Sequence, residues 1–192
     1  HIFRGHGIGS HGTSTGEMCF NTSMTGYQEI LTDPSYSGQI INFTFPHVGN
    51  VGTNPEDMET NAVVTRGLVL REDITKPSNW RATRHFNEWL RAHKLIGICG
   101  LDTRRITRLI RDNGAQIAAL AHSKEQIDLK ALVSEAQSCC GLSGVDLAQE
   151  VSCSKAYNWD ECKWTREKGY VRQKAAKYNI IAVDFGVKHN IL

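Results

Sequence analysis

The chain has 192 residues, of which 40% are hydrophobic and 22% are charged, and its formal net charge at pH 7 is +2. This composition excludes an intrinsically disordered chain and predicts a globular protein with one substantial core and room for part of a second domain. Because 22 basic residues nearly balance 20 acidic ones, and no signal peptide or apolar run of roughly 20 residues is present, we expect a cytoplasmic protein that binds neither nucleic acid nor membrane.

The first part of the chain reads as two strands with a short helix between them. Apolar and β-branched residues dominate Met18–Ser23 and Gln39–Phe45, which predicts strands. Residues 27–36 predict a short helix that Asp33-Pro34 stops, because the residue before a proline avoids the helical region. Beyond this segment we expect a strand at Ala62–Arg71, a helix at Ser78–His93, a strand at Leu95–Leu101, a helix at Thr103–Asp112, a strand at Ala115–Ala121 and a helix capped by Ser123. Together these elements predict a mixed α/β layer beside a β-rich beginning.

Two of the expected helices carry local signals. Asp102 is placed to cap the helix Thr103–Asp112, and Gly114 is placed to end it. In the helix Ser78–His93 the large apolar side chains are spaced to share an inner face, namely Trp80, Phe86, Trp89 and Leu90.

The character of the sequence changes after residue 140. From Gly141 the periodicity fades and Lys163–Lys177 is strongly basic and polar, so we expect a domain over 1–140 and a connecting segment over 141–177. Tyr178–Asp184 is a continuous apolar run of the parallel-strand kind, and a turn begins after it. We therefore expect 178–192 to be the start of an α/β domain that continues beyond the last residue.

Several motifs imitate chemical sites but lack a required part. Gly7, Gly9 and Gly12 have the spacing of a dinucleotide fingerprint, yet no helix is expected after them, so a glycine-rich hairpin is favoured. Cys99 stands between small residues as in a nucleophile elbow, but Leu101 occupies the place of the second glycine, and a core cysteine is favoured. The six cysteines and eight histidines show no metal-ligand spacing, so we expect free thiols and no metal site.

The most informative stretch is Phe20–Asn54, which is dense in special-purpose residues yet contains no self-contained catalytic set. Such a combination indicates a surface that fits a partner. The stretch closely resembles the N-terminal domain of the small chain of glutamine-dependent carbamoyl-phosphate synthetase, where F-N-T-S-M-T-G-Y-Q-E-I-L-T-D-P-S-Y precedes a strand and then P-H-I/V-G-N-V-G-T-N. Further runs that match this family, so that the resemblance covers essentially the whole chain, are Gly100–Arg105 with Thr107-Arg108, Gly141–Ala148 and Asp184–Leu192.

The resemblance implies a fold and a function. The family's N-terminal domain is an α/β unit of the swivelling β/β/α type, and a class I glutamine amidotransferase domain follows it, of which 178–192 would be the first strand. The small chain hydrolyses glutamine to glutamate and ammonia. A large chain then makes carbamoyl phosphate from the ammonia, bicarbonate and two ATP, for arginine and pyrimidine synthesis. ATP and Mg act in the large chain, so we expect this chain to bind no cofactor.

The resemblance does not supply the glutaminase machinery itself. That chemistry needs a thiolate, a histidine that manages protons and an acid that orients the histidine. In the family these three residues lie in the amidotransferase domain past the stretch seen here, so we assign no catalytic residue and expect the 192-residue chain alone to be inactive. The alternative is a non-catalytic assembly module, as in relatives that lack the amidotransferase cysteine and use free ammonia.

Two residues are candidates for the glutamine site. The resemblance implies that the serine of D-P-S-Y, here Ser35, reaches across to touch glutamine, and that the lysine of D-F-G-x-K, here Lys188, lies near the pocket. From the residues alone, Ser35 is equally well explained as a hydroxyl that ends a helix, and Lys188 as a surface charge.

The partner implied is the large chain, in a heterodimer. Arg104, Arg105 and Arg108 share one face of an expected helix, where they could pair with acidic groups of a partner, although a solvated helix face is the simpler interpretation. A nucleic-acid binder that uses these arginines is a third possibility, which the nearly neutral charge disfavours. The opening segment supplies further interface candidates, namely Tyr27, His47 and Asn50.

Overall fold

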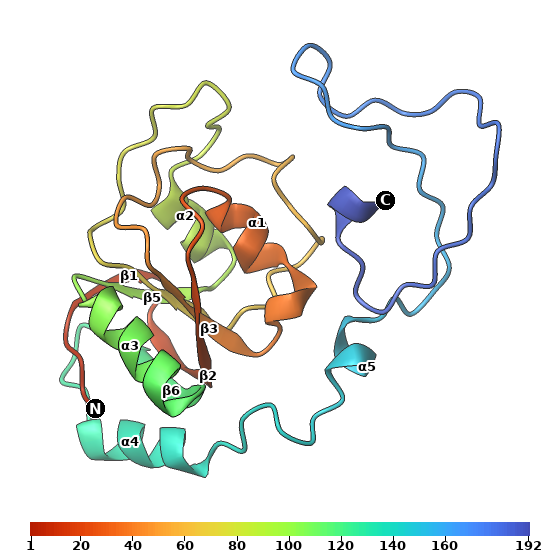
Figure 1. Cartoon of the computed structure of the whole chain (residues 1–192). Helices are drawn as coiled ribbons and strands as arrows, with labels where there is room; N and C mark the ends of the chain where they lie inside the picture. The colour runs from red at the N-terminus through yellow and green to blue at the C-terminus, as the bar shows by residue number, and fades with distance from the viewer.

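A six-stranded sheet, curled so that β6 also approaches β5 and β1, forms the centre of the molecule (Figure 1). The computed structural model describes residues 1–192. The strands are β1 (His6–Gly9), β2 (Gly12–Asn21), β3 (Gln39–Phe43), β4 (Gly67–Val69), β5 (Ile96–Cys99) and β6 (Gln116–His122). Their order in the sheet is β1-β5-β4-β3-β2-β6. The four inner strands run parallel, whereas β1 and β6 pair antiparallel at the two edges.

The helices are short. They are α1 (Tyr27–Thr32), α2 (Phe86–Ala92), α3 (Thr103–Asn113), α4 (Leu129–Ser138) and α5 (Leu147–Val151), with 3₁₀ turns η1 (Pro34–Tyr36) and η2 (His189–Ile191). None of them has the length and apolar character that crossing a membrane requires.

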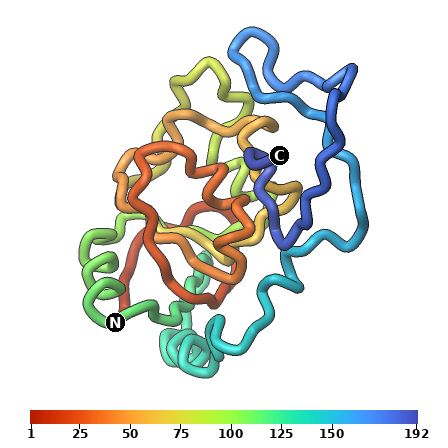
Figure 2. Tube along the Cα trace, turned by 45° about the vertical axis from the view of Figure 1, so that its right-hand side comes forward, coloured from red at the N-terminus to blue at the C-terminus, as the bar shows by residue number.

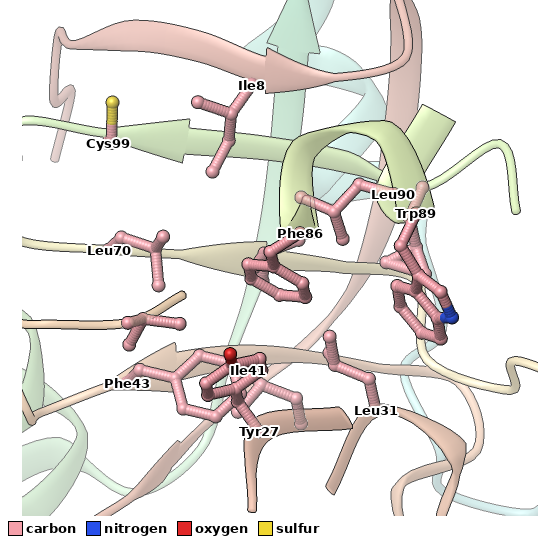
Figure 3. Packing of buried hydrophobic residues seen from close by; sticks show 13 residues of the cluster. Ile8, Tyr27, Leu31, Ile41, Phe43, Leu70, Phe86, Trp89, Leu90 and Cys99 are labelled. Carbon is pink, nitrogen blue, oxygen red and sulfur yellow. The ribbon is translucent and has the colours of Figure 1, made fainter. Parts of the chain in front are cut away.

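Side chains that alternate along the strands give the sheet two apolar faces. Ile41 and Leu68 belong to one buried cluster, into which α1 and α2 also pack their apolar side chains. Their sequence neighbours Ile40 and Val69 belong to a second cluster, into which α3 packs. Figure 3 shows the first cluster, where Phe86 of α2 lies among side chains of the strands and of α1. The sheet is therefore the middle layer, and α1 and α3 lie on its opposite faces.

This arrangement confirms the predicted mixed α/β class and several of its elements. β3, β5 and β6 fall on predicted strands, and β2 includes its predicted strand as far as Asn21 but begins earlier. α3 begins as predicted, because the Asp102 carboxylate accepts a hydrogen bond from the backbone N–H of Arg105 at 3.0 Å. Gly114 follows α3 with a φ of 78°, in the left-handed region that favours glycine.

The helix predicted over Ser78–His93 is wrong in its first half, because only α2 is helical. The N–H groups of Thr83 and Arg84 both donate to the carbonyl of Thr53, which holds this part of the backbone extended. The helix then starts at a histidine cap, where Nδ1 of His85 accepts from the N–H of Asn87 at 3.2 Å. Trp80 is consequently 68% exposed and does not share the inner face of α2.

Two further boundaries differ from the predictions. The helix expected after Ser123 begins only at Leu129, because Asp128 caps it by accepting two backbone N–H groups, whereas the hydroxyl of Ser123 accepts within a local turn. The strand expected over Ala62–Arg71 is reduced to β4. At α4 the cap decides the boundary, and the hydrophobic pattern alone does not show it.

The glycines at the start of the chain do not form the predicted hairpin. β1 pairs with β5 and β2 pairs with β3 and β6, so the two strands that contain these glycines are not hydrogen-bonded to each other. Gly9 has a φ of 71°, and a Cβ there would lie 2.2 Å from the carbonyl oxygen of Leu95. The close approach of the Leu95 backbone therefore explains why position 9 is a glycine. A strand follows these glycines instead of a helix, so they do not form a phosphate-binding motif.

Residues 141–192 contain α5 and η2 but no strand of the sheet, and they pass along one side of the molecule (Figure 2). The strand predicted over Tyr178–Asp184 is wrong. Its apolar side chains face solvent, with Ile181 93% exposed. A strand needs a neighbour that pairs its backbone groups, and no other strand of this chain lies beside this run.

Candidate functional site

The turn after α1 presents the first candidate residue. α1 ends at Thr32 because Pro34 follows, and Pro34 opens the 3₁₀ turn η1. The carboxylate of Asp33 accepts the backbone N–H of Ser35 at 2.9 Å, which fixes the turn. Ser35 is exposed, and its hydroxyl makes no hydrogen bond within the chain. The hydroxyl is therefore free to contact a ligand.

Lys188 reaches the same turn from the other end of the chain, where η2 lies beside α1 (Figure 1). Its Nζ lies 2.5 Å from Oδ2 of Asp33, whose side chain is only 10% exposed. This hydrogen bond, together with the carboxylate charge, raises the pKa of Lys188 although partial burial opposes the shift. The sequence predicts Ser35 and Lys188 at one site. The backbone N–H of Ser35 and the ammonium group of Lys188 thus bind the two oxygens of the Asp33 carboxylate.

A second acidic residue holds the turn that follows Lys188. The backbone N–H of His189 donates to the carbonyl of Glu59 at 2.9 Å. The Glu59 carboxylate accepts the side-chain amide of Asn190 at 2.7 Å and its backbone N–H at 3.3 Å. Glu59 is 8% exposed, and its own N–H donates to the hydroxyl of Thr32 at 2.9 Å. The end of α1, the loop around Glu59 and the C-terminal turn therefore form one connected junction.

The junction is strongly acidic. Burial raises the pKa of Glu29, on α1, to about 7, and the negative charges of Asp57 and Glu59 add to the shift while Arg81 opposes it. Arg81 itself is paired with Asp57 at 2.6 Å and with Glu56 at 3.1 Å. One cation thus serves several carboxylates, and Glu29 is the one that takes up a proton near neutral pH.

A groove of about 790 Å³ lies next to this junction, between the loop at 53–61, the segment 83–93 that contains α2, and residues of the C-terminal part. Trp164 fastens that part in place, because its Nε1 donates to Glu56 at 2.9 Å and the Arg81 guanidinium lies 4.8 Å from its ring centre. Aromatic rings of Trp159 and Tyr170 form part of the wall, but neither Ser35 nor Lys188 lines it. The groove and the Ser35 turn are therefore neighbouring features and not one cavity.

The predicted interface residues fall into separate places. Arg104, Arg105 and Arg108 are all exposed on α3, on the opposite face of the sheet from the junction. His47 is exposed, and Asn50 is half-buried in the loop after β3. Tyr27 is only 4% exposed. Its hydroxyl donates to the carbonyl of Gly52 at 2.6 Å. The Tyr27 side chain is thus a core element that fixes this loop, and its burial argues against a place in an interface.

The chain offers no assembled nucleophile or metal centre. Cys99 is buried in β5, and burial raises the pKa of its thiol, with the neighbouring Asp73 adding to the effect. Burial likewise raises the pKa of Cys19 to about 11, so neither thiol is activated. No group of three or more His, Cys, Asp or Glu side chains is placed to hold a metal ion.

Sequence reasoning missed the two acidic residues of the junction. Asp33 carried a signal, because an aspartate before a proline often accepts the N–H two residues on, as it does here with Ser35. Its long-range pairing with Lys188 had no signal in the local pattern. Glu59 had none either, because nothing in its neighbourhood distinguishes it from Glu56.

Known proteins resemble this chain over its whole length. The family model of the carbamoyl-phosphate synthase small chain, CPSase domain, matches residues 1–120. The carbamoyl phosphate synthase small chain of Ruegeria pomeroyi is 52% identical over 192 residues, and that of Bradyrhizobium diazoefficiens is 50% identical over 196 residues. Each comparison covers 100% of this chain and 50% of the relative, so the chain spans about half the length of the curated relatives it matches. The chain belongs to the carbamoyl-phosphate synthase small chain family.

Proposed function

We propose that this chain forms one wall of the glutamine site in a glutamine-dependent carbamoyl-phosphate synthase, whose small chain releases ammonia to a large chain. The observation that carries the proposal is the position of Ser35 and Lys188 on the two oxygens of Asp33. Membership of the small-chain family and the names of the relatives support it. The ATP and Mg chemistry, which serves arginine and pyrimidine synthesis in the cytoplasm, belongs in this proposal to the large chain.

The contribution of this chain is binding and not bond cleavage. The exposed Ser35 hydroxyl can donate to and accept from the polar groups of glutamine, and Lys188 supplies a positive charge that Asp33 keeps protonated. The thiolate, histidine and acid that would attack the side-chain amide come in this proposal from a further domain of the small chain. In this proposal, contact with the large chain would enclose the path of the product, ammonia, which has to be passed on without loss to water.

Replacing Ser35 or Lys188 by alanine in the full-length small chain, assembled with its large chain, should raise the KM for glutamine about tenfold. Each change removes one hydrogen-bonding group worth roughly 1–2 kcal/mol. Synthesis from added ammonia should stay unchanged, because that route bypasses the glutamine site. Steady-state kinetics with both nitrogen sources measures this.

Matched controls are Ser123→Ala and Lys124→Ala, both at exposed positions in the connection between β6 and α4, which should leave both activities unchanged. The 192-residue chain alone should release no ammonia from glutamine. Glutamine hydrolysis by that chain, or an unchanged KM in both Ser35→Ala and Lys188→Ala, would contradict the proposal. A full small chain without any glutaminase activity would favour the assembly module that uses free ammonia.

The arginine face of α3 (Arg104, Arg105, Arg108) is the proposed docking surface for the large chain, because its exposed guanidinium groups suit acidic side chains on a partner. The double change Arg104→Glu and Arg108→Glu should weaken association of the two chains at least tenfold at low salt, and less at high salt because salt screens the charges. Titration calorimetry measures the affinity. The control is Arg166→Glu with Lys168→Glu, an equal change of charge at exposed positions off the face. Equal affinities for both double variants would remove the face from the interface.

A further inference from the structure

Glu59 binds both the end of α1 and the C-terminal turn (residues 188–190) through several groups. Toward α1, its backbone N–H donates to Thr32, and the hydroxyl of the next residue, Thr60, donates to the Thr32 carbonyl at 2.8 Å. Toward the C-terminal turn, its carbonyl and its carboxylate accept hydrogen bonds from His189 and Asn190. Thr32 directly precedes Asp33, and His189 directly follows Lys188. Glu59 thus binds the residues that stand next to Asp33 and Lys188, the two members of the ion pair.

The chemistry of the loop shows why Glu59 is the residue with this role. Of the four acidic side chains gathered here, Glu56 and Asp57 are already paired with Arg81. Burial raises the pKa of Glu29 to about 7, so a proton largely neutralises this side chain below that pH. Glu59 is only 8% exposed, and its carboxylate is not paired with a cation. The carboxylate instead accepts hydrogen bonds from the backbone N–H and the side-chain amide of Asn190. A buried carboxylate is stabilised only if such donors stay in place.

The same carboxylate also acts on Lys188 at a distance. Its charge contributes to the raised pKa of Lys188, after the contribution of Asp33. Removal of Glu59 would therefore loosen the turn that holds Lys188 and would weaken the electrostatic attraction that keeps the ammonium at the junction. Both effects displace Lys188 from Asp33 without removing any group that would touch glutamine.

We propose that Glu59 is a positioning residue for the glutamine site, which holds the turn at 188–190 so that Lys188 stays on Asp33 beside Ser35. The inference rests on the proposed function, since it presumes that Ser35 and Lys188 meet glutamine. It adds a residue that binds no substrate and acts only through the geometry of the other two.

The test uses the full-length small chain in complex with its large chain. Glu59→Ala should raise the KM for glutamine about tenfold and change kcat less than twofold, while ammonia-dependent synthesis stays as in the wild type. Glu59→Gln should give a smaller increase of KM, because its carbonyl can still accept the Asn190 amide while its NH₂ group opposes the Asn190 N–H. The Gln variant is isosteric, so it keeps the test valid if the Ala variant does not fold. The matched control is Glu88→Gln, an exposed glutamate on α2 whose side chain contacts neither the turn nor Arg81, and it should leave the KM unchanged.

Hydrogen exchange separates positioning from general damage. In Glu59→Gln the amide protons of His189 and Asn190 should exchange at least tenfold faster, while amides in β3 and β5 keep their protection. In the double variant Glu59→Ala with Lys188→Ala, the KM should be close to that of Lys188→Ala alone, because Glu59 acts through Lys188.

The outcomes separate this inference from the proposed function. If Ser35→Ala and Lys188→Ala raise the KM but both Glu59 variants leave it unchanged, the positioning role is wrong and the proposed function stands. If none of the four variants alters the KM, the proposed function fails, and the positioning role fails with it. If the Glu59 variants lower glutamine-dependent and ammonia-dependent synthesis equally, the effect is structural and the positioning role is wrong.

Discussion

Phe86→Ala is expected to lower the free energy of unfolding by about 3–5 kcal/mol, which is the usual cost of removing a large aromatic side chain from a core. Phe86 is the first residue of α2 and is fully buried, with its ring centre 4.6 Å from that of Tyr27 and 6.0 Å from that of Trp89. Truncation would leave a cavity between α1, α2 and the sheet that these rigid elements cannot close. Urea denaturation followed by circular dichroism measures the change.

The matched control for this prediction is Trp80→Ala, because Trp80 lies in the same predicted helix but is 68% exposed in the structure. Its replacement should change the free energy of unfolding by no more than about 0.5 kcal/mol. A cost for Trp80→Ala that equals the cost for Phe86→Ala would mean that the longer helix, with both side chains on one inner face, is the correct description.

Glu29→Gln is expected to stabilise the protein by about 2–3 kcal/mol at pH 8 and to have little effect at pH 4. Burial raises the pKa of Glu29 from 4.5 to about 7, so between these two values the folded state binds a proton that the unfolded state has released. Stability therefore falls as the pH rises through this window, and the cost is complete above pH 7. Each unit of the shift corresponds to about 1.4 kcal/mol, which sets an upper limit near 3.5 kcal/mol.

Glutamine at this position keeps the shape and cannot ionise, so it removes the pH-dependent cost without changing the packing. Denaturation of wild type and variant at matched pH values from 4 to 8 gives the difference directly, and the titration of all other groups cancels in it. A difference that is the same at pH 4 and pH 8 would show that the effect of the substitution does not come from ionisation of Glu29.

The parts of the fold that could be predicted from the sequence are those governed by neighbouring residues. The strands β3, β5 and β6 have apolar residues at strand periodicity, and α3 has its cap at Asp102 and its glycine at Gly114. These signals act within a few residues, so no knowledge of the rest of the molecule is needed. The family resemblance further predicted that Ser35 and Lys188 belong together, and the structure brings both to Asp33.

The parts that could not be predicted depend on contacts between distant residues. The backbone before α2 is held extended by hydrogen bonds from Thr83 and Arg84 to Thr53, which overrides a good helical pattern. The apolar run Tyr178–Asp184 has strand composition but no neighbouring strand, so its composition is not enough. Glu59 becomes special only through Thr32 and Asn190, neither of which is near it in the sequence.

The alternation of side chains along β3 has a mechanical consequence. Ile41 packs into the layer of α1, which ends at the Ser35 turn, and Ile40 packs into the layer of α3, which carries the arginine face. Asn42 strengthens the second connection, because its side-chain amide donates to Thr103 and Thr107 of α3. Only β3 thus separates α3 from the layer that ends at the junction. Because a closely packed interior resists deformation, a displacement of α3 is transmitted through this strand to the junction.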